Sequence, residues 1–454
     1  RICSVSHANS QSRDAQSRDA QSIAAPVQVS ERVPALDTLR GFAVLGILLM
    51  NIWSFAGPQA IYDYPVAAAD WGGAPVATWA VMHTLFEGSQ RALFSLLFGA
   101  GMLLMVTRLD AAATTIRAGR IYYRRLVFLM LFGLFDLFVL LWPADIIFVY
   151  GVCGLALYPL RKCKPVTLLA LALLVFAAHA GLRALDWQEA QRLQAVYSQY
   201  EVNPALAEDE RVAADIKDWE AKVARARPDL NDPKLQENMR ITRSGDLGEF
   251  LRLKLQTSLV LLIVLGLKVM LLDSLGAMLV GMALLKLGVL TLQVPTRVYV
   301  LMLVCGYGIG LPIAAWEAAA LLATDFDPLL KARNLIHYDI RRLAVALGHL
   351  SAIMLVCRAF PTSALVTRLA PVGRMALTNY LAQSMLCGLL FYSVGFGLYA
   401  QFTGYYLWLL VLCIWAVLIV FSNAWLQRYR FGPFEWLWRS LTYKQRQPMR
   451  LGSE

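Results

Sequence analysis

Long apolar runs recur along almost the whole chain, and they decide what it can fold into. Each run holds roughly 18 or more mostly apolar residues, the length that an α-helix needs to cross the hydrocarbon core of a bilayer. Hydrophobic residues make up 58% of the 454 residues and charged residues only 16%, which lies outside the range of soluble globular proteins. We therefore predict an all-α fold, a polytopic membrane bundle of about ten transmembrane helices. The expected spans lie near 41–56, 77–107, 125–142, 144–160, 166–184, 252–290, 296–316, 339–357, 374–394 and 404–426. The run 252–290 is too long for one crossing, so a surface helix followed by one span is expected there.

Basic residues in the short connections predict how the bundle is oriented. Clusters of Arg and Lys follow the second, fourth and eighth expected spans and fill the C-terminal tail. Because such loops stay in the cytoplasm, an even number of spans places both termini on the cytoplasmic side.

Polar segments divide the chain into five parts. We expect a disordered tail over 1–31, which carries a tandem Ser-Arg-Asp-Ala-Gln repeat and lacks the apolar core of a signal peptide. A first transmembrane half over 32–184 and a second over 251–427 flank a polar insertion at 185–250. Because an odd number of expected spans precedes it, the insertion is expected outside the cytoplasm. It forms either a solvated helical hairpin or a cap that contacts a substrate. A basic cytoplasmic tail follows at 428–454, where the aromatic and basic stretch 431–443 resembles a helix lying on the inner leaflet.

The net charge of +11 points to lipid rather than to nucleic acid. The cations flank apolar segments, so anionic membrane lipids are the expected partners and no nucleic acid is expected. The seven cysteines show no metal-binding spacing, and no metal is expected.

A basic layer is expected at the cytoplasmic mouth of the bundle. Asp37 and Arg40 stand three residues apart at the start of the first span, so they share one helix face. Arg374 begins the ninth span at the same depth, near Arg120, Arg124 and Arg125. This layer either holds the phosphates of a cytosolic cofactor or consists of arginines that reach to lipid phosphates.

An acid and imidazole layer is expected near the outer surface. It comprises His83 and Glu87 on the second span, Asp136 on the third and Asp145 just after it. Equal depth allows His83 to meet Asp136, and one helical turn separates His83 from Glu87, so the imidazole has two possible acidic partners. A histidine oriented by a carboxylate is the usual form of a general base, although the same contacts can simply satisfy buried polar groups, and Glu87 can instead pair with Arg91. His349 is a lesser candidate, and His179 is expected to be structural.

Several ordered motifs resemble the YeiB family of bacterial membrane proteins, a domain of unknown function. The resemblance covers everything from about residue 34 onward. Its motifs are Leu36-Asp-Thr-Leu-Arg-Gly-Phe-Ala, Leu93-Phe-Ser-Leu-Leu-Phe-Gly-Ala-Gly, Trp142-Pro-Ala-Asp-Ile-Ile-Phe-Val-Tyr-Gly, Gly281-Met-Ala-Leu-Leu-Lys-Leu-Gly-Val, Gly373-Arg-Met-Ala-Leu-Thr-Asn-Tyr-Leu and Gly432-Pro-Phe-Glu-Trp-Leu-Trp-Arg-Ser-Leu-Thr. The resemblance implies a multi-pass protein of the bacterial cytoplasmic (inner) membrane.

The Asp-x-x-Arg-Gly start is similar to that of transmembrane acyltransferases, which take acyl groups from coenzyme A. By this likeness acyl-coenzyme A is the expected donor, and a small-molecule or glycan hydroxyl or amine is the expected acceptor. Asn379 or Asn51 is the candidate oxyanion donor beside the base His83. The alternative is a transporter or exporter of a small amphiphilic molecule, with the same buried acids as proton or substrate sites; a non-catalytic scaffold is a third interpretation. Oligomers are compatible with every interpretation.

Overall fold

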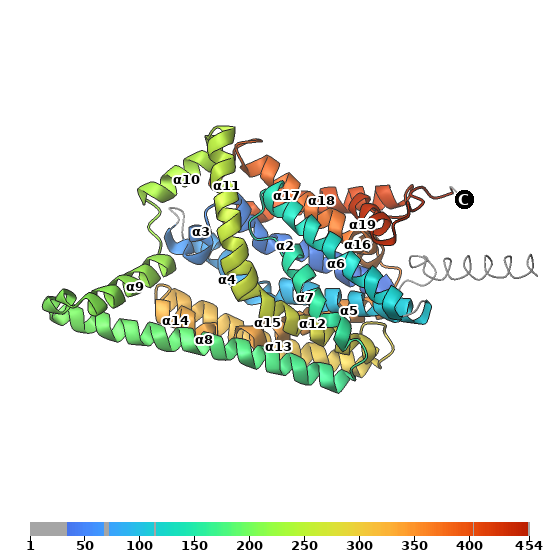
Figure 1. The fold of residues 1–454 in the computed structure, drawn as a ribbon, viewed down its shortest axis with the longest axis horizontal. Coiled ribbons are helices and arrows are strands. Elements are labelled where there is room, and N and C mark those ends of the chain that lie inside the picture. The colour runs from blue at the N-terminus through green and yellow to red at the C-terminus, as the bar shows by residue number, and fades with distance from the viewer. Residues whose placement is uncertain (1–33, 68–71, 113–114, 403, 453–454) are drawn as a thin grey trace, which may run out of the picture.

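The computed structural model describes residues 34–67, 72–112, 115–402 and 404–452, and its regular elements are helices (Figure 1). The first half contains α2 (Pro34–Ala56), α3 (Gln59–Asp63), η2 (Pro65–Ala67), α4 (Gly73–Leu85), α5 (Ser89–Ala112), α6 (Thr115–Phe138), α7 (Ile147–Leu160) and α8 (Pro165–Val202). The insertion adds η3 (Pro204–Glu208), α9 (Glu210–Ala226) and α10 (Pro233–Ser244). The second half contains α11 (Leu247–Leu261), the π-helical η4 (Leu262–Met270), α12 (Leu271–Lys286), α13 (Thr296–Ala323), α14 (Pro328–Asn334), α15 (Tyr338–Ala359), α16 (Ala364–Arg374), α17 (Ala376–Phe391), α18 (Tyr405–Leu426) and α19 (Pro433–Tyr443). The expected all-α bundle is confirmed, while the expected tail 1–31 lies outside the described residues.

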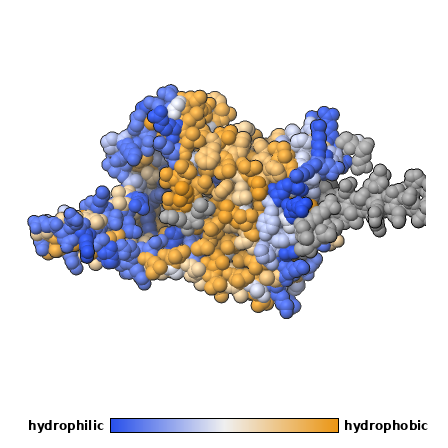
Figure 2. Space-filling model, in the orientation of Figure 1, coloured by the Kyte–Doolittle hydropathy of each residue, from blue (hydrophilic) through white to orange (hydrophobic). Residues whose placement is uncertain are grey.

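A hydrophobic band crosses the middle of the molecule between two hydrophilic ends (Figure 2). One end carries α9 and the C-terminal part of α8, and the other carries α19 and the C-terminus (Figure 1). Six helices of the described chain are long and apolar enough to cross a membrane by length and composition. They comprise Pro34–Ala56, Gly73–Ala111 with a break inside it, Pro165–Val202, Thr296–Ala323, Tyr338–Ala359 and Tyr405–Leu426, and α7 and α17 are shorter apolar helices. The chain is thus built as a membrane protein, and the larger number of about ten crossings stays a prediction.

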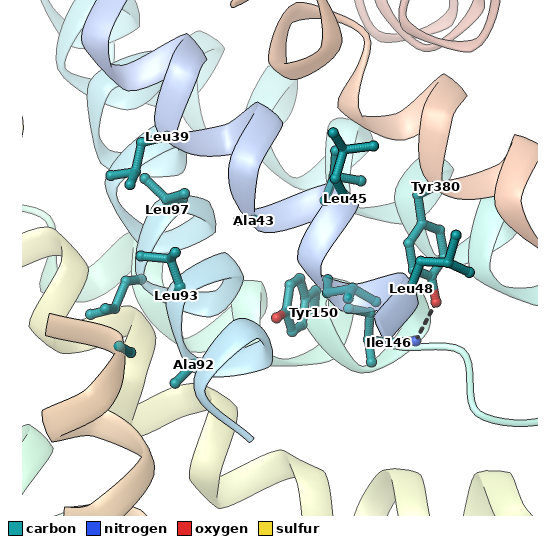
Figure 3. Packing of buried hydrophobic residues seen from close by; sticks show 14 of the residues in the cluster. Leu39, Ala43, Leu45, Leu48, Ala92, Leu93, Leu97, Ile146, Tyr150 and Tyr380 are labelled. Atoms are coloured by element: carbon teal, nitrogen blue, oxygen red, sulfur yellow. Dashed lines mark hydrogen bonds between the residues drawn. The ribbon is translucent and has the colours of Figure 1, made fainter. Parts of the chain in front are cut away.

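Helix α2 forms the centre of the bundle, and α8, α13 and α18 form its outer face. The most apolar window of α2 is 72% buried, whereas that of α8 is only 17% buried. Large apolar side chains on the outer helices, such as Leu173 and Val420, are exposed, and lipid is the environment that suits them. The core around α2 is closely packed with Leu39, Leu93 and Tyr150 (Figure 3).

Glycines set the closest helix crossings at the centre. A Cβ atom on Gly373 would lie 1.8 Å from the carbonyl oxygen of Asp37, and one on Gly41 would lie 2.2 Å from that of Leu369. Only residues without a side chain allow two backbones to approach this closely. Helices α2 and α16 are therefore fixed against each other at the basic end of the bundle.

Two expected spans differ from the structure. The run 77–107 is not one helix: α4 ends at Leu85 and α5 begins at Ser89, because Gly88 adopts a φ of 70° in the left-handed region. The run 252–290 is a continuous helical path through α11, η4 and α12 rather than a separate surface helix. The boundary at 184 is likewise absent, since α8 continues from the hydrophobic band into the insertion.

Candidate functional site

A cavity of about 290 Å³ lies between α2, α5, α6, α7, α17 and α19. We call it the collared cavity, because arginines line one part of it and apolar side chains line the rest. The arginines are Arg40, Arg108, Arg125, Arg374 and Arg439. Along α5 the lining runs from Arg108 back to Phe94, which is 14 residues or about 21 Å of helix. The collared cavity therefore joins a cationic end to an apolar interior that reaches deep into the hydrophobic band.

The collar contains three of the residues that the sequence analysis placed in the basic layer. Arg40 Nη1 lies 3.2 Å from Asp37 Oδ1, so the expected helical pair is confirmed. Arg374 also lines the cavity, and its buried Nε has no hydrogen-bond partner in the described chain. Among Arg120, Arg124 and Arg125 only the last lines it.

Arg125 is held by the C-terminal helix. Its guanidinium lies 3.5 Å from the ring centre of Trp438, whose indole Nε1 donates to the Arg125 carbonyl at 2.9 Å. Glu435 fixes α19 in turn, because its Oε1 accepts from the backbone N–H groups of Leu377 (2.7 Å) and Thr378 (3.0 Å) at the start of α17. The helix expected on the inner leaflet is thus a wall of the collared cavity.

Two carboxyl groups lie just behind this cavity. Asp145 accepts from the backbone N–H groups of Ile147 (3.1 Å) and Phe148 (2.8 Å) at the start of α7, and Tyr380, which lines the cavity, donates to it at 3.4 Å. The same tyrosine hydroxyl accepts from the Ile146 N–H (Figure 3). Asp136 is fully buried beside Asp145.

A second cavity, of about 390 Å³, lies towards the insertion, and we call it the histidine cavity. His83 Nδ1 lies 2.6 Å from Glu87 Oε2, and its Nε2 lies 3.5 Å from Glu317 Oε2. Glu317 also binds Arg341 Nε at 2.9 Å and His337 Nε2 at 2.8 Å. Glu87 therefore orients the imidazole, Glu317 lies within ion-pair distance of its other nitrogen, and Arg341 balances the charge of Glu317.

The structure corrects two expectations about these residues. His83 and Asp136 do not meet: no hydrogen bond or ion pair joins them, and His83 uses Glu87, the partner one helical turn away. The alternative pair of Glu87 with Arg91 is also not formed, because Arg91 Nη2 lies 2.6 Å from Asp273 Oδ2.

His349 and His179 lie outside both cavities. His349 bonds Tyr307 at 2.8 Å and the Leu85 carbonyl at 2.8 Å. Asp339 lies 2.6 Å from His179, and both side chains are buried. These contacts satisfy buried polar groups, which agrees with the structural role expected of His179.

Asn379 is not at either cavity. Its Nδ2 donates to the Val372 carbonyl at 3.0 Å and to Ser422 Oγ at 2.9 Å, so it joins α17 to α18. Neither Asn379 nor Asn51 lines the collared or the histidine cavity. Both N–H groups of the Asn379 side chain are thus used in hydrogen bonds that hold the helices together.

A layer of buried charge separates the two cavities, which share no lining residue. Tyr150 lines the collared cavity and donates to the Arg91 carbonyl at 3.2 Å; Arg91 Nη2 donates to Tyr338, which lines the histidine cavity, at 3.2 Å. Arg91 and Arg342 flank Asp273 at 2.6 and 3.7 Å. We call Arg91, Asp273, Tyr338, Asp339 and Arg342 the central charge layer.

Sequence reasoning missed Glu317 and the central charge layer as parts of the site. Glu317 stands alone in the apolar helix α13, and Asp273 stands alone in α12, so an intramembrane acid was the available signal in both cases. Among the residues that the structure describes, no group of three or more His, Cys, Asp or Glu side chains is arranged to hold a metal ion. The charged groups instead form ion pairs that share members, such as Glu317 with Arg341 and His337.

Comparisons with known proteins agree with a membrane protein shared among bacteria. Residues 284–445 match a family model described as a protein of unknown function (DUF418). The chain is 31% identical to the uncharacterized protein YeiB of Escherichia coli (strain K12) over 430 residues, which cover 92% of this chain and 98% of that protein. It is 30% identical to the uncharacterized protein YxaH of Bacillus subtilis (strain 168) over 433 residues, which cover 93% of this chain and 97% of that protein. No solved structure matches the chain.

Proposed function

This chain belongs to the family of the YeiB and YxaH proteins, and from its own geometry we propose that it is a membrane-embedded acyltransferase. It would move an acyl group from acyl-coenzyme A, or a similar thioester, to a hydroxyl or amine of a glycan or small molecule. One observation carries the proposal: an apolar cavity with an arginine collar lies on one side of the central charge layer, and a histidine held by two acids lies on the other.

The collared cavity suits a donor that combines phosphates with a long, less polar arm. Guanidinium groups bind phosphate oxygens through paired hydrogen bonds, and Arg40 and Arg374 are placed to supply them. Apolar residues such as Phe98, Met102 and Ile147 would surround the pantetheine arm and the acyl group. The proposal that the cavity binds acyl-coenzyme A is supported by this match between its arginine and apolar lining and the phosphates and apolar arm of the donor.

The histidine cavity suits activation of the acceptor. His83 would take the proton of the acceptor hydroxyl or amine, while Glu87 orients the ring and stabilises the imidazolium. The acceptor oxygen or nitrogen then forms a bond to the thioester carbonyl carbon, the carbon–sulfur bond breaks, and the thiolate takes up a proton. The products are an ester or amide and a free thiol. The central charge layer would have to open between Tyr150 and Tyr338 for the two substrates to meet.

The bacterial cytoplasmic membrane, with both termini inside, is the location that we propose with this function. The collar would then face the compartment that holds coenzyme A, and the insertion would face outward. Basic residues near the collar favour this orientation.

The test measures binding and transfer with purified protein in nanodiscs and radiolabelled acetyl-coenzyme A. We expect Arg374→Gln to weaken donor binding about 10- to 100-fold, because one charge-assisted contact contributes about 1.5–3 kcal/mol. Arg368→Gln is the matched control, since Arg368 is exposed on the same helix α16. The proposal fails if wild-type protein does not bind the donor, or if both variants bind it equally.

His83→Asn separates catalysis from donor binding. We expect it to lower the transfer rate about 100-fold or more, because a general base is lost, and to leave donor affinity unchanged. His349→Asn, which removes a buried histidine outside the cavity, is the control and should keep most of the activity. Equal transfer by wild type and His83→Asn would exclude this base.

A transporter of small amphiphiles is the second candidate. The buried Arg91–Asp273 pair, with a cavity on either side of it, would serve as the central site of an alternating-access transporter. Uptake or release of an unmodified acyl compound by proteoliposomes, without any transfer product, would favour transport over catalysis.

A further inference from the structure

The histidine cavity holds a buried amide that nothing in the described chain satisfies. Asn334, at the end of α14, lines this cavity and is only 8% exposed. Neither its Nδ2 nor its Oδ1 has a hydrogen-bond partner. A buried amide without partners is unfavourable, so a group that donates and accepts hydrogen bonds is expected beside it. A hydroxyl group has both properties.

The same cavity has an excess of positive charge at the insertion. Lys222 and Arg225 stand three residues apart on α9 and line the cavity together with Lys331 of α14. Within the residues that the structure describes, neither Lys222 nor Arg225 forms an ion pair within 4 Å, although Lys222 interacts with Glu189 at longer range. Lys331 donates its Nζ to the backbone carbonyls of Asp63 (2.7 Å) and Ala226 (2.8 Å). An anion would therefore meet three cations at this rim.

The acids in the cavity do not cancel this charge. Glu87 is engaged with His83, and Glu317 is engaged with Arg341 and His337. Asp63 accepts from the neutral amide of Gln59 at 3.0 Å, and its carboxylate offsets part of the charge of Lys331. Lys222 and Arg225 are thus left to a ligand, and together with Lys331 they suit the charge and the several oxygens of a phosphate group.

From the cationic rim and the unsatisfied Asn334 beside His83, we infer that this cavity binds a hydroxyl-bearing phosphate compound, with the phosphate at α9 and the hydroxyl at Asn334. The inference deepens the proposed function, because it names the acceptor class and assigns the insertion the binding of its phosphate. The phosphate can belong to a soluble polyol phosphate or to the headgroup of a lipid such as phosphatidylglycerol. Binding itself needs no thioester donor.

The experiment measures binding to the full chain in phosphatidylcholine nanodiscs without any donor. Glycerol 3-phosphate is titrated calorimetrically against glycerol, and a parallel arm compares melting temperatures in nanodiscs with and without phosphatidylglycerol. We expect glycerol 3-phosphate to bind at least 10-fold more tightly than glycerol, or phosphatidylglycerol to raise the melting temperature, and the responding arm identifies the source of the phosphate.

Variants of α9 provide the decisive comparison. Lys222→Gln with Arg225→Gln should weaken the response at least 10-fold. Arg211→Gln with Lys217→Gln removes the same charge from exposed positions of the same helix outside the cavity, and it should change binding less than 2-fold. Asn334→Ala should weaken binding of glycerol 3-phosphate without lowering the melting temperature of the free protein.

Three results would overturn the inference: no response in either arm, equal binding of glycerol and glycerol 3-phosphate, or equal losses in the two double variants. Its failure is distinguishable from failure of the acyltransferase proposal, because acetyl-coenzyme A binding at Arg374 is measured separately. A chain that binds the donor but no phosphate compound refutes this inference alone. If the chain binds the phosphate compound but not the donor, the phosphate site is supported and the acyltransferase proposal fails.

Discussion

Lys331 shows at the scale of one residue how the histidine cavity is held together. Its Nζ bonds to Asp63 and Ala226 tie α14 to α3 and to the end of α9. Its pKa is lowered from 10.5 to about 8, chiefly by burial and to a lesser degree by Arg227, while Asp63, Asp325 and Glu87 oppose the shift. The ammonium is therefore held in a position that disfavours its charge.

This shift predicts a pH dependence of stability. Between about pH 8 and 10.5 the folded chain has lost the Lys331 proton while the unfolded chain keeps it, so the unfolding free energy rises with pH in that window. The slope from one group is at most about 1.4 kcal/mol per pH unit. Lys331→Met should unfold at a lower temperature at every pH and should lack this part of the rise. Thermal unfolding in detergent from pH 7 to 11 measures it, and parallel curves for the two proteins would contradict the expectation.

Local pairs could be predicted from the sequence, and contacts between distant residues could not. Asp37 with Arg40 and His83 with Glu87 are three and four residues apart, so helical geometry alone predicts them. The predicted contact of His83 with Asp136 was wrong, because equal depth in a bilayer does not say which helices are neighbours. Glu317 reaches His83 from α13, which stands far away in sequence.

At the scale of elements, glycines decide how closely the helices pack. Apolar runs predict where most helices lie, but the break at Gly88 depends on a backbone conformation that hydrophobicity does not encode. The crossing of α2 and α16 depends similarly on Gly41 and Gly373. Because Asp37, Arg40 and Arg374 all stand at this crossing, it sets the width of the collar.

Gly373→Ala tests this crossing. The added methyl group would meet the Asp37 carbonyl at 1.8 Å, so α16 must move away from α2, at a cost of about 1–3 kcal/mol. We expect a lower melting temperature and weaker binding of acetyl-coenzyme A. The matched control is Gly181→Ala on α8, where a Cβ meets nothing within 4 Å, so the change should be neutral or stabilising. Equal effects of the two substitutions would show that the close crossing is unimportant.

At the scale of the whole molecule, the sequence predicted the membrane class well and the connectivity of the site poorly. The hydrophobic band and the two polar ends follow from composition and run length (Figure 2). The placement of one cavity on each side of the central charge layer does not, since it depends on how α5, α12 and α15 pack together. The orientation of the ends relative to the cell stays a prediction.

Cysteine labelling tests that orientation. Arg368 belongs to α16 and Lys222 to α9, and these two helices lie towards opposite ends of the molecule (Figure 1). An impermeant maleimide applied to intact spheroplasts should label Lys222→Cys, and it should label Arg368→Cys only after the membrane is broken. The unsubstituted chain, with its seven cysteines, gives the background. The reverse pattern would place the collar outside and remove its access to cytosolic coenzyme A.

The 38 residues of α8 form one uninterrupted helix, about 57 Å long, from the hydrophobic band to the tip of the insertion. Its inner part holds His179 against Asp339, and its outer part packs on α9. Asp339 also lies 2.8 Å from Arg342, so a single helix joins the polar insertion directly to the buried charges at the centre of the bundle.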